Sequence, residues 1–94
     1  MLKLLSIGFT YQGVQNYTII RVKEKDDHIE YHVTVMNGEL EKILYGDHII
    51  VEKAGKLEVQ DEKEDSQQAK LKFEITNALK SYLTLHPLQA GDFF

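Results

Sequence analysis

The chain has 94 residues, of which 43% are hydrophobic and 28% charged, and it carries a formal net charge of −4 and no cysteine. This length and composition fit one globular domain with one core. The lack of cysteine excludes disulfide bonds, thiolate metal sites and thiol nucleophiles. The basic residues are scattered among acidic neighbours, which argues against binding to nucleic acid or to an anionic membrane surface. We therefore expect a small soluble protein of the reducing cytoplasm.

The first quarter of the chain predicts two strands. Residues 2–9 form an apolar run that Lys3 interrupts and that no small-residue cleavage site follows, so we interpret them as a strand rather than as a signal peptide. Turn-forming residues follow at positions 12–16. Residues 17–23 are rich in β-branched and aromatic side chains, which favour a pleated, half-buried strand. A charged connection at residues 24–27 ends this second strand.

The clearest strand covers residues 29–36. Apolar residues stand at its odd positions and polar residues at most of its even positions, which is the pattern of a strand with one wet face. Asn37-Gly38 follows directly, and this dipeptide is a strong hairpin signal that predicts a fourth strand over residues 40–45. The same segment also fits one short helical turn, and the sequence leaves both interpretations open.

Two shorter strands are predicted over residues 48–53 and 56–60, with Ala54-Gly55 as the turn between them. Because all the connections are short, consecutive strands should pair in antiparallel fashion. The charge run of residues 61–65 is interpreted as a solvated acidic loop that leads into a helix.

A C-terminal helix is predicted over residues 66–85. Asp65 is a suitable N-cap, and Gln68 stands three residues later in a capping-box arrangement. Apolar residues recur at helical spacing from Leu71 to Tyr82, and Pro87 stops the pattern. Residues 69–75 also alternate as a strand would, so a strand followed by a shorter helix is the alternative.

These elements predict one α+β domain over residues 1–94. An antiparallel β-meander of five or six short strands (residues 1–60) is followed by the acidic loop (61–65), the amphipathic helix (66–85) and a tail (86–94), and the helix packs against the sheet. The predicted core residues share an inward position on a strand or on the helix stripe: Ile19 or Ile20, Val22, Tyr31, Val33, Val35, Ile43, Ile49, Val51, Leu57, Leu71, Ile75, Leu79 and Tyr82.

The sequence predicts no catalytic residue, no cofactor and no metal site. His28 and His32 lie about 13 Å apart along one strand, and the strand predicted at residues 40–45 separates His32 from His48, so these histidines, together with His86, do not form a zinc site. Neither a Gly-x-Ser-x-Gly motif nor a phosphate-binding glycine loop is present. These observations favour a protein that is not an enzyme.

Phe73 breaks the local pattern because it lies opposite the apolar stripe of the predicted helix. Together with Phe93 and Phe94 at the end of the chain, it is a candidate contact for a protein partner or a second copy, unless the tail covers it. We therefore expect a non-enzymatic interaction module that can form a homodimer. The alternative is a small-ligand-binding domain or small enzyme with a pocket between sheet and helix, lined by core tyrosines.

Overall fold

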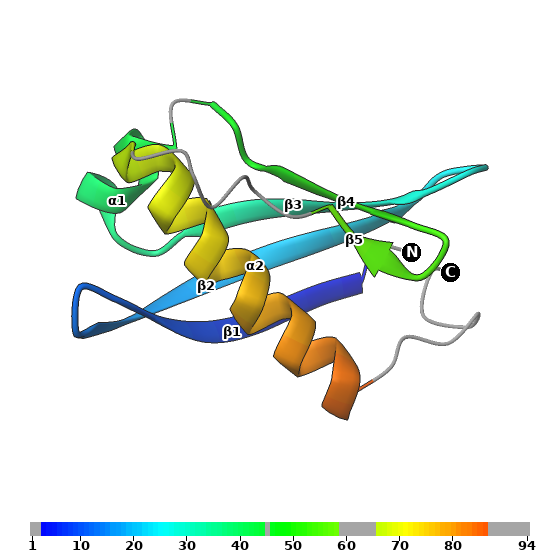
Figure 1. Cartoon of the computed structure of the whole chain (residues 1–94), viewed down its shortest axis with the longest axis horizontal. Coiled ribbons are helices and arrows are strands. Elements are labelled where there is room, and N and C mark those ends of the chain that lie inside the picture. The colour runs from blue at the N-terminus through cyan, green and yellow to red at the C-terminus, as the bar shows by residue number, and fades with distance from the viewer. Residues whose placement is uncertain (1–2, 45, 59–65, 87–94) are drawn as a thin grey trace.

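A computed structural model describes residues 3–44, 46–58 and 66–86. Its elements follow one another along the chain as β1 (Lys3–Tyr11), β2 (Val14–Glu24), β3 (Ile29–Val35), α1 (Gly38–Ile43), β4 (Ile49–Lys53), β5 (Lys56–Leu57) and α2 (Gln67–Leu85). The five strands form one antiparallel sheet in sequence order, curled into a half-barrel around α2 (Figure 1). This confirms the predicted α+β class. The predicted acidic loop and the tail after His86 lie outside the described residues.

The β1–β2 hairpin is longer and its turn tighter than predicted. The two strands pair without interruption from Lys3 opposite Val22 to Tyr11 opposite Val14. Only Gln12 and Gly13 form the turn, and both have positive φ angles, of 51° and 77°. A two-residue turn with this backbone matches the right-handed twist of the strands that it joins, so pairing continues up to the turn.

No helix within the described ranges is long and apolar enough to cross a membrane.

The predicted strand over residues 40–45 is wrong, and the helical alternative is correct. Asn37 does not open a hairpin but caps α1, because its side chain accepts hydrogen bonds from the backbone N–H groups of Glu39 and Leu40. Leu40 and Leu44 lie one helical turn apart, and both are buried in the core. The chain therefore leaves the sheet after β3 and re-enters it at β4, which pairs directly with β3.

One face of the sheet and α2 enclose the core. Eight predicted core residues are buried: Ile20, Val22, Tyr31, Val33, Val35, Leu71, Ile75 and Leu79. Ile43, Leu57 and Tyr82 are partly buried against them. The inward assignment of Ile49 and Val51 is wrong, since Ile50 is the buried residue of β4 and Ile49 is 40% exposed. A shift of one residue along a strand moves every side chain to the other face.

The helix α2 is confirmed throughout residues 67–85, and the strand alternative for residues 69–75 is wrong. Its N-cap is Ser66 rather than Asp65, because the Ser66 hydroxyl accepts a hydrogen bond of 3.1 Å from the backbone N–H of Ala69. Gln68 does not complete a capping box. Its side-chain amide instead donates to the carbonyl of Leu44 at 2.6 Å, which ties the first turn of α2 to the end of α1.

A buried lysine fixes the middle of α2 to the start of β4. Lys72 is only 8% exposed, and its Nζ donates to Oδ1 of Asp47 at 2.5 Å and to the carbonyl of Ile49 at 2.8 Å. We expect Lys72→Met to lower the free energy of unfolding by about 1–3 kcal/mol, because the carbonyl of Ile49 loses the hydrogen bond that Lys72 donates to it. The carboxylate of Asp47 is half exposed and can bind water in the variant, which limits the loss of stability.

Urea denaturation of wild type, Lys72→Met and Lys80→Met measures this effect. Lys80 is an exposed lysine of the same helix and controls for the change of charge and helix propensity. Equal midpoints for the two variants would show that the contact of Lys72 with β4 contributes nothing to stability.

Candidate functional site

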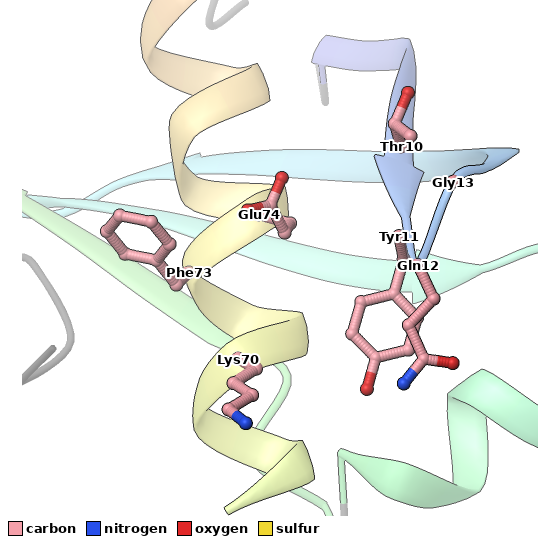
Figure 2. A pocket seen from close by; sticks show the side chains of 7 residues that line it. All are labelled: Thr10, Tyr11, Gln12, Gly13, Lys70, Phe73 and Glu74. Carbon is pink, nitrogen blue, oxygen red and sulfur yellow. The ribbon is translucent and has the colours of Figure 1, made fainter. Parts of the chain in front are cut away.

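The one described member of the predicted partner contact, Phe73, lies beside a cleft. Phe73 is half-buried on α2, whereas Phe93 and Phe94 lie outside the described residues. The cleft has a volume of about 400 Å³ and lies between the β1–β2 turn and α2. Its lining comes from these two segments alone: Thr10, Tyr11, Gln12, Gly13, Lys70, Phe73 and Glu74 (Figure 2).

Tyr11 is the unusual residue of this cleft. It is the last residue of β1, its side chain is 7% exposed, and its hydroxyl is buried without a hydrogen-bond partner among the described residues. Buried hydroxyl groups are nearly always hydrogen-bonded, because an unpaired one loses its interactions with water without compensation. Sequence reasoning missed Tyr11 because the predicted strand ended at Phe9. The alternation of Leu5, Ile7 and Phe9 continues to Tyr11 and was the signal that could have identified it.

The face of the sheet opposite α2 is the second notable surface. Seven large hydrophobic residues are exposed in the described part of the chain, and five of them lie on this outer face: Leu4, Tyr17, Ile19, Met36 and Ile49. The remaining two are Val14 beside the β1–β2 turn and Leu85 at the end of α2. Apolar residues gathered on one surface commonly mark a contact with another molecule. Because the sheet curls around α2, this outer face is convex.

The third notable surface is the free edge of β1. The sheet order places β1 at one edge and β5 at the other, and no described strand pairs with the outer side of β1. β1 has nine residues, whereas β5 has only two. The helix α2 crosses the sheet obliquely, and in Figure 1 its C-terminal end extends beyond β1. That end carries Leu85, which is 76% exposed.

A network of charged side chains lies at the start of β3 and consists of Asp27, His28, Glu30 and His32. The ring of His28 contacts Asp27 through Nδ1 at 2.6 Å and Glu30 through Nε2 at 2.9 Å, and Nε2 of His32 contacts the second oxygen of Glu30 at 2.9 Å. His28 and His32 therefore share a carboxylate. A neutral imidazole has one N–H, so both carboxylates receive a hydrogen bond only from the protonated ring of His28.

The pKa values follow from these contacts. The pKa of His28 is raised, first because Glu30 and then because Asp27 accepts a hydrogen bond from its ring. The pKa of Glu30 is lowered to about 2, first by His28 and then by His32. Within the described ranges no group of three or more histidine and acidic side chains could hold a metal ion. The expected separation of His32 from His48 is wrong, because β3 and β4 are neighbours and the carbonyl of His48 accepts from Val33 N–H at 2.8 Å.

We expect the network of Asp27, His28, Glu30 and His32 to stabilise the fold most between pH 4.5 and 6.5. The pKa of His28 is raised above its ordinary 6.5, so its contribution is complete below pH 6.5 and is lost as the pH rises through the raised value. The pKa of Glu30 is lowered from 4.5 to about 2, so its contribution is lost as the pH falls between these values. The measurement is the difference in unfolding free energy between wild type and His28→Gln as a function of pH.

His86→Gln is the control, because His86 is an exposed histidine at the end of α2. A difference between wild type and His28→Gln that is constant from pH 4 to about 9 would contradict the assigned pKa directions.

Comparison of the chain with protein families, with curated proteins and with solved structures finds no match.

Proposed function

We propose that the protein is a non-enzymatic interaction module that forms a homodimer by pairing the free edges of two β1 strands. The observation that carries the proposal is a nine-residue edge strand with no described strand beside it. The backbone N–H and C=O groups along such an edge can pair with a strand of another chain. Within the described residues, no serine or threonine hydroxyl is hydrogen-bonded to a histidine, which gives an acyl-transfer enzyme no support.

β1 carries few of the features that protect the edges of natural sheets. Such edges are usually short, bulged, interrupted by proline or marked by charged side chains. β1 pairs with β2 without a bulge over its whole length, contains no proline and has its single charge at Lys3. The opposite edge is protected, because β5 is two residues long and begins with Lys56. The asymmetry favours β1 as the side at which the sheet is extended.

The sequence of β1 suits pairing with a second copy of itself. Antiparallel pairing about Ile7 places Leu5 opposite the second copy's Phe9 on the side of the sheet that faces the core. It places Ser6 opposite the second copy's Gly8 on the outer face. Apolar residues therefore meet apolar residues, and small residues meet small ones, which is the arrangement that stabilises cross-strand pairs. The result is one continuous sheet with a twofold axis.

The overhanging end of α2 gives this dimer a second contact. In Figure 1 this end extends past β1 on the side where a second sheet would lie. Tyr82 and Leu83 are partly buried there and Leu85 is 76% exposed. A second copy joined at β1 would cover this apolar surface, and burial of apolar area contributes roughly 25 cal/mol per Å². Pairing of two convex outer faces offers less contact area, which favours the edge as the interface.

Sedimentation equilibrium tests the proposal. The expected mass is twice the monomer mass of 10.9 kDa. Ser6→Lys places a long charged side chain on the outer face of the edge strand, opposite the second copy's Gly8 and diagonal to the second copy's own lysine, and is expected to weaken the dimer by about tenfold or more. Thr34→Lys is the matched control, because Thr34 is an exposed outer-face residue of the interior strand β3, and this variant should leave the dimer intact.

Two outcomes would overturn the proposal. One is a wild-type protein that is monomeric over the whole concentration range. The other is a dimer that Thr34→Lys or Ile19→Lys dissociates and Ser6→Lys does not, because the outer faces would then form the interface. Far-UV circular dichroism of every variant establishes that a change in mass does not come from unfolding. Leu85→Asp provides a second probe, with Val14→Asp, which is 60% exposed outside the proposed interface, as its control.

A further inference from the structure

We propose that the cleft between the β1–β2 turn and α2 binds a small aromatic carboxylate that also carries a hydrogen-bond donor at its other end. This inference goes beyond the proposed dimer and uses different side chains. A cleft of about 400 Å³ falls within the range of small-ligand pockets. The ligand class follows from the polar groups that line the cleft and from where each lies.

The buried hydroxyl of Tyr11 is the group that points to a ligand. The side chain is more than nine-tenths buried and lines the cleft, and its hydroxyl has no hydrogen-bond partner among the described residues. Most buried polar side-chain atoms have such a partner, and an unpaired one in a cleft suggests that a bound molecule provides it. A hydroxyl can donate a hydrogen bond to a carboxylate or carbonyl oxygen of that molecule.

The two ends of the cleft differ in charge. Figure 2 shows the hydroxyl of Tyr11, the side-chain amide of Gln12 and the amino group of Lys70 toward one end, and the carboxylate of Glu74 toward the other. The first end offers hydrogen-bond donors and a positive charge, which suit a carboxylate. The second end offers an acceptor, which suits a hydroxyl or amino group. A ligand that matches both ends is therefore acidic at one end and a donor at the other.

An apolar body between these ends completes the match. The ring of Tyr11 forms an apolar wall, and Phe73 also belongs to the lining, although in Figure 2 its ring lies on the side of α2 away from Tyr11. Aromatic rings suit such walls because they bury a large area with little loss of conformational freedom.

Three probes that share one ring test the assignment of the charged end. The probes are 4-hydroxyphenylacetate, 4-hydroxyphenethyl alcohol and tyramine, whose head groups are negative, neutral and positive at neutral pH. Titration of isotope-labelled protein followed by NMR should show saturable shifts at Tyr11, Gln12 and Lys70. The acid should bind at least about fivefold more tightly than the alcohol, with a Kd on the order of 1 mM for a probe of this size.

Variants of the lining residues test which groups bind the probe. Tyr11→Phe keeps the ring and removes only the hydroxyl, and it should weaken binding of the acid by about tenfold. Tyr17→Phe is the matched control, because Tyr17 is 58% exposed on the outer face. Lys70→Gln should also weaken binding, whereas Lys80→Gln on the exposed side of α2 should not. Phe73→Ser should weaken binding and leave the mass of the dimer unchanged, which separates this proposal from the previous one.

Three results would overturn the assignment. The first is an absence of saturable shifts up to the solubility limit of the acid. The second is tighter binding of tyramine than of the acid, which would assign the head group to Glu74. The third is equal affinity of wild type and Tyr11→Phe, which would show that the buried hydroxyl has no part in binding.

Discussion

Ile50→Asp is expected to unfold the protein, whereas Ile49→Asp, one residue earlier, is expected to leave it folded. Ile50 is 2% exposed, and Ile49 is 40% exposed on the outer face. An aspartate at position 50 would place an unpaired carboxylate in the core, where it costs more than about 5 kcal/mol. That cost is comparable with the whole stability of a small domain. An aspartate at position 49 stays in water and should change stability by about 1 kcal/mol or less.

Circular dichroism at 25 °C and urea denaturation distinguish the two variants. The pair is informative because the substitutions are chemically identical and their positions adjacent, so strand propensity and net charge change equally in both. Equal stability of the two proteins would contradict the register in which Tyr31 lies opposite Ile50 and His32 opposite Ile49.

Leu71→Ala is expected to lower the free energy of unfolding by about 3–5 kcal/mol. The side chain of Leu71 is fully buried between α2 and the sheet. Its truncation removes apolar contacts and leaves a cavity, because the surrounding residues relax only in part. The effect is large for this fold, since α2 is the main cover of the apolar face of the sheet (Figure 1). The measurement is the unfolding free energy from urea denaturation.

Two companion variants keep this prediction testable if Leu71→Ala does not fold. Leu71→Met conserves volume and should lose less than about 1.5 kcal/mol. Val14→Ala truncates an apolar side chain at a position that is 60% exposed and lies outside the proposed dimer interface, and it should change stability by no more than about 0.5 kcal/mol. A loss for Leu71→Ala as small as that for Val14→Ala would contradict the packing of α2 on the sheet.

The dimer and the ligand site can be tested separately because they use different parts of β1. The proposed dimer interface is the backbone edge of β1, together with the end of α2. The proposed ligand site uses side chains at the end of β1 and in the second and third turns of α2. Ser6→Lys alters the edge without changing the lining of the cleft, and Tyr11→Phe alters the lining without changing the backbone. Failure of one proposal therefore leaves the other intact.

The elements that the sequence predicted well are those with strong periodicity. Alternation of apolar and polar residues identified β3 almost to the residue, and the stripe from Leu71 to Tyr82 identified α2. These patterns are readable because each strand or helix has one face in the core and one in water. The helix α1 was not separable from a strand, because Leu40, Ile43 and Leu44 fit one helical turn, whereas Ile43 and Tyr45 alternate as in a strand. Its capping residue, Asn37, also serves in hairpin turns.

The candidate site was only half visible in the sequence. Phe73 was identified because an aromatic residue on the polar side of a helix violates the amphipathic pattern. Tyr11 was not identified, because a tyrosine at the end of a strand is ordinary unless its hydroxyl lacks a partner. That property depends on which atoms from α2 surround the ring, and α2 begins more than fifty residues later in the chain.

The sequence by itself determined the α+β class, most strands and the C-terminal helix, because local propensity and periodic burial are properties of neighbouring residues. The tertiary structure alone decided that β3 pairs with β4, that Ile50 rather than Ile49 faces the core, and that Lys72 is buried against Asp47. It also decided that β1 is a free edge and that Tyr11 lines a cleft beside α2. Each of these features depends on contacts between segments far apart in the chain, and local patterns carry little information about which distant segments meet.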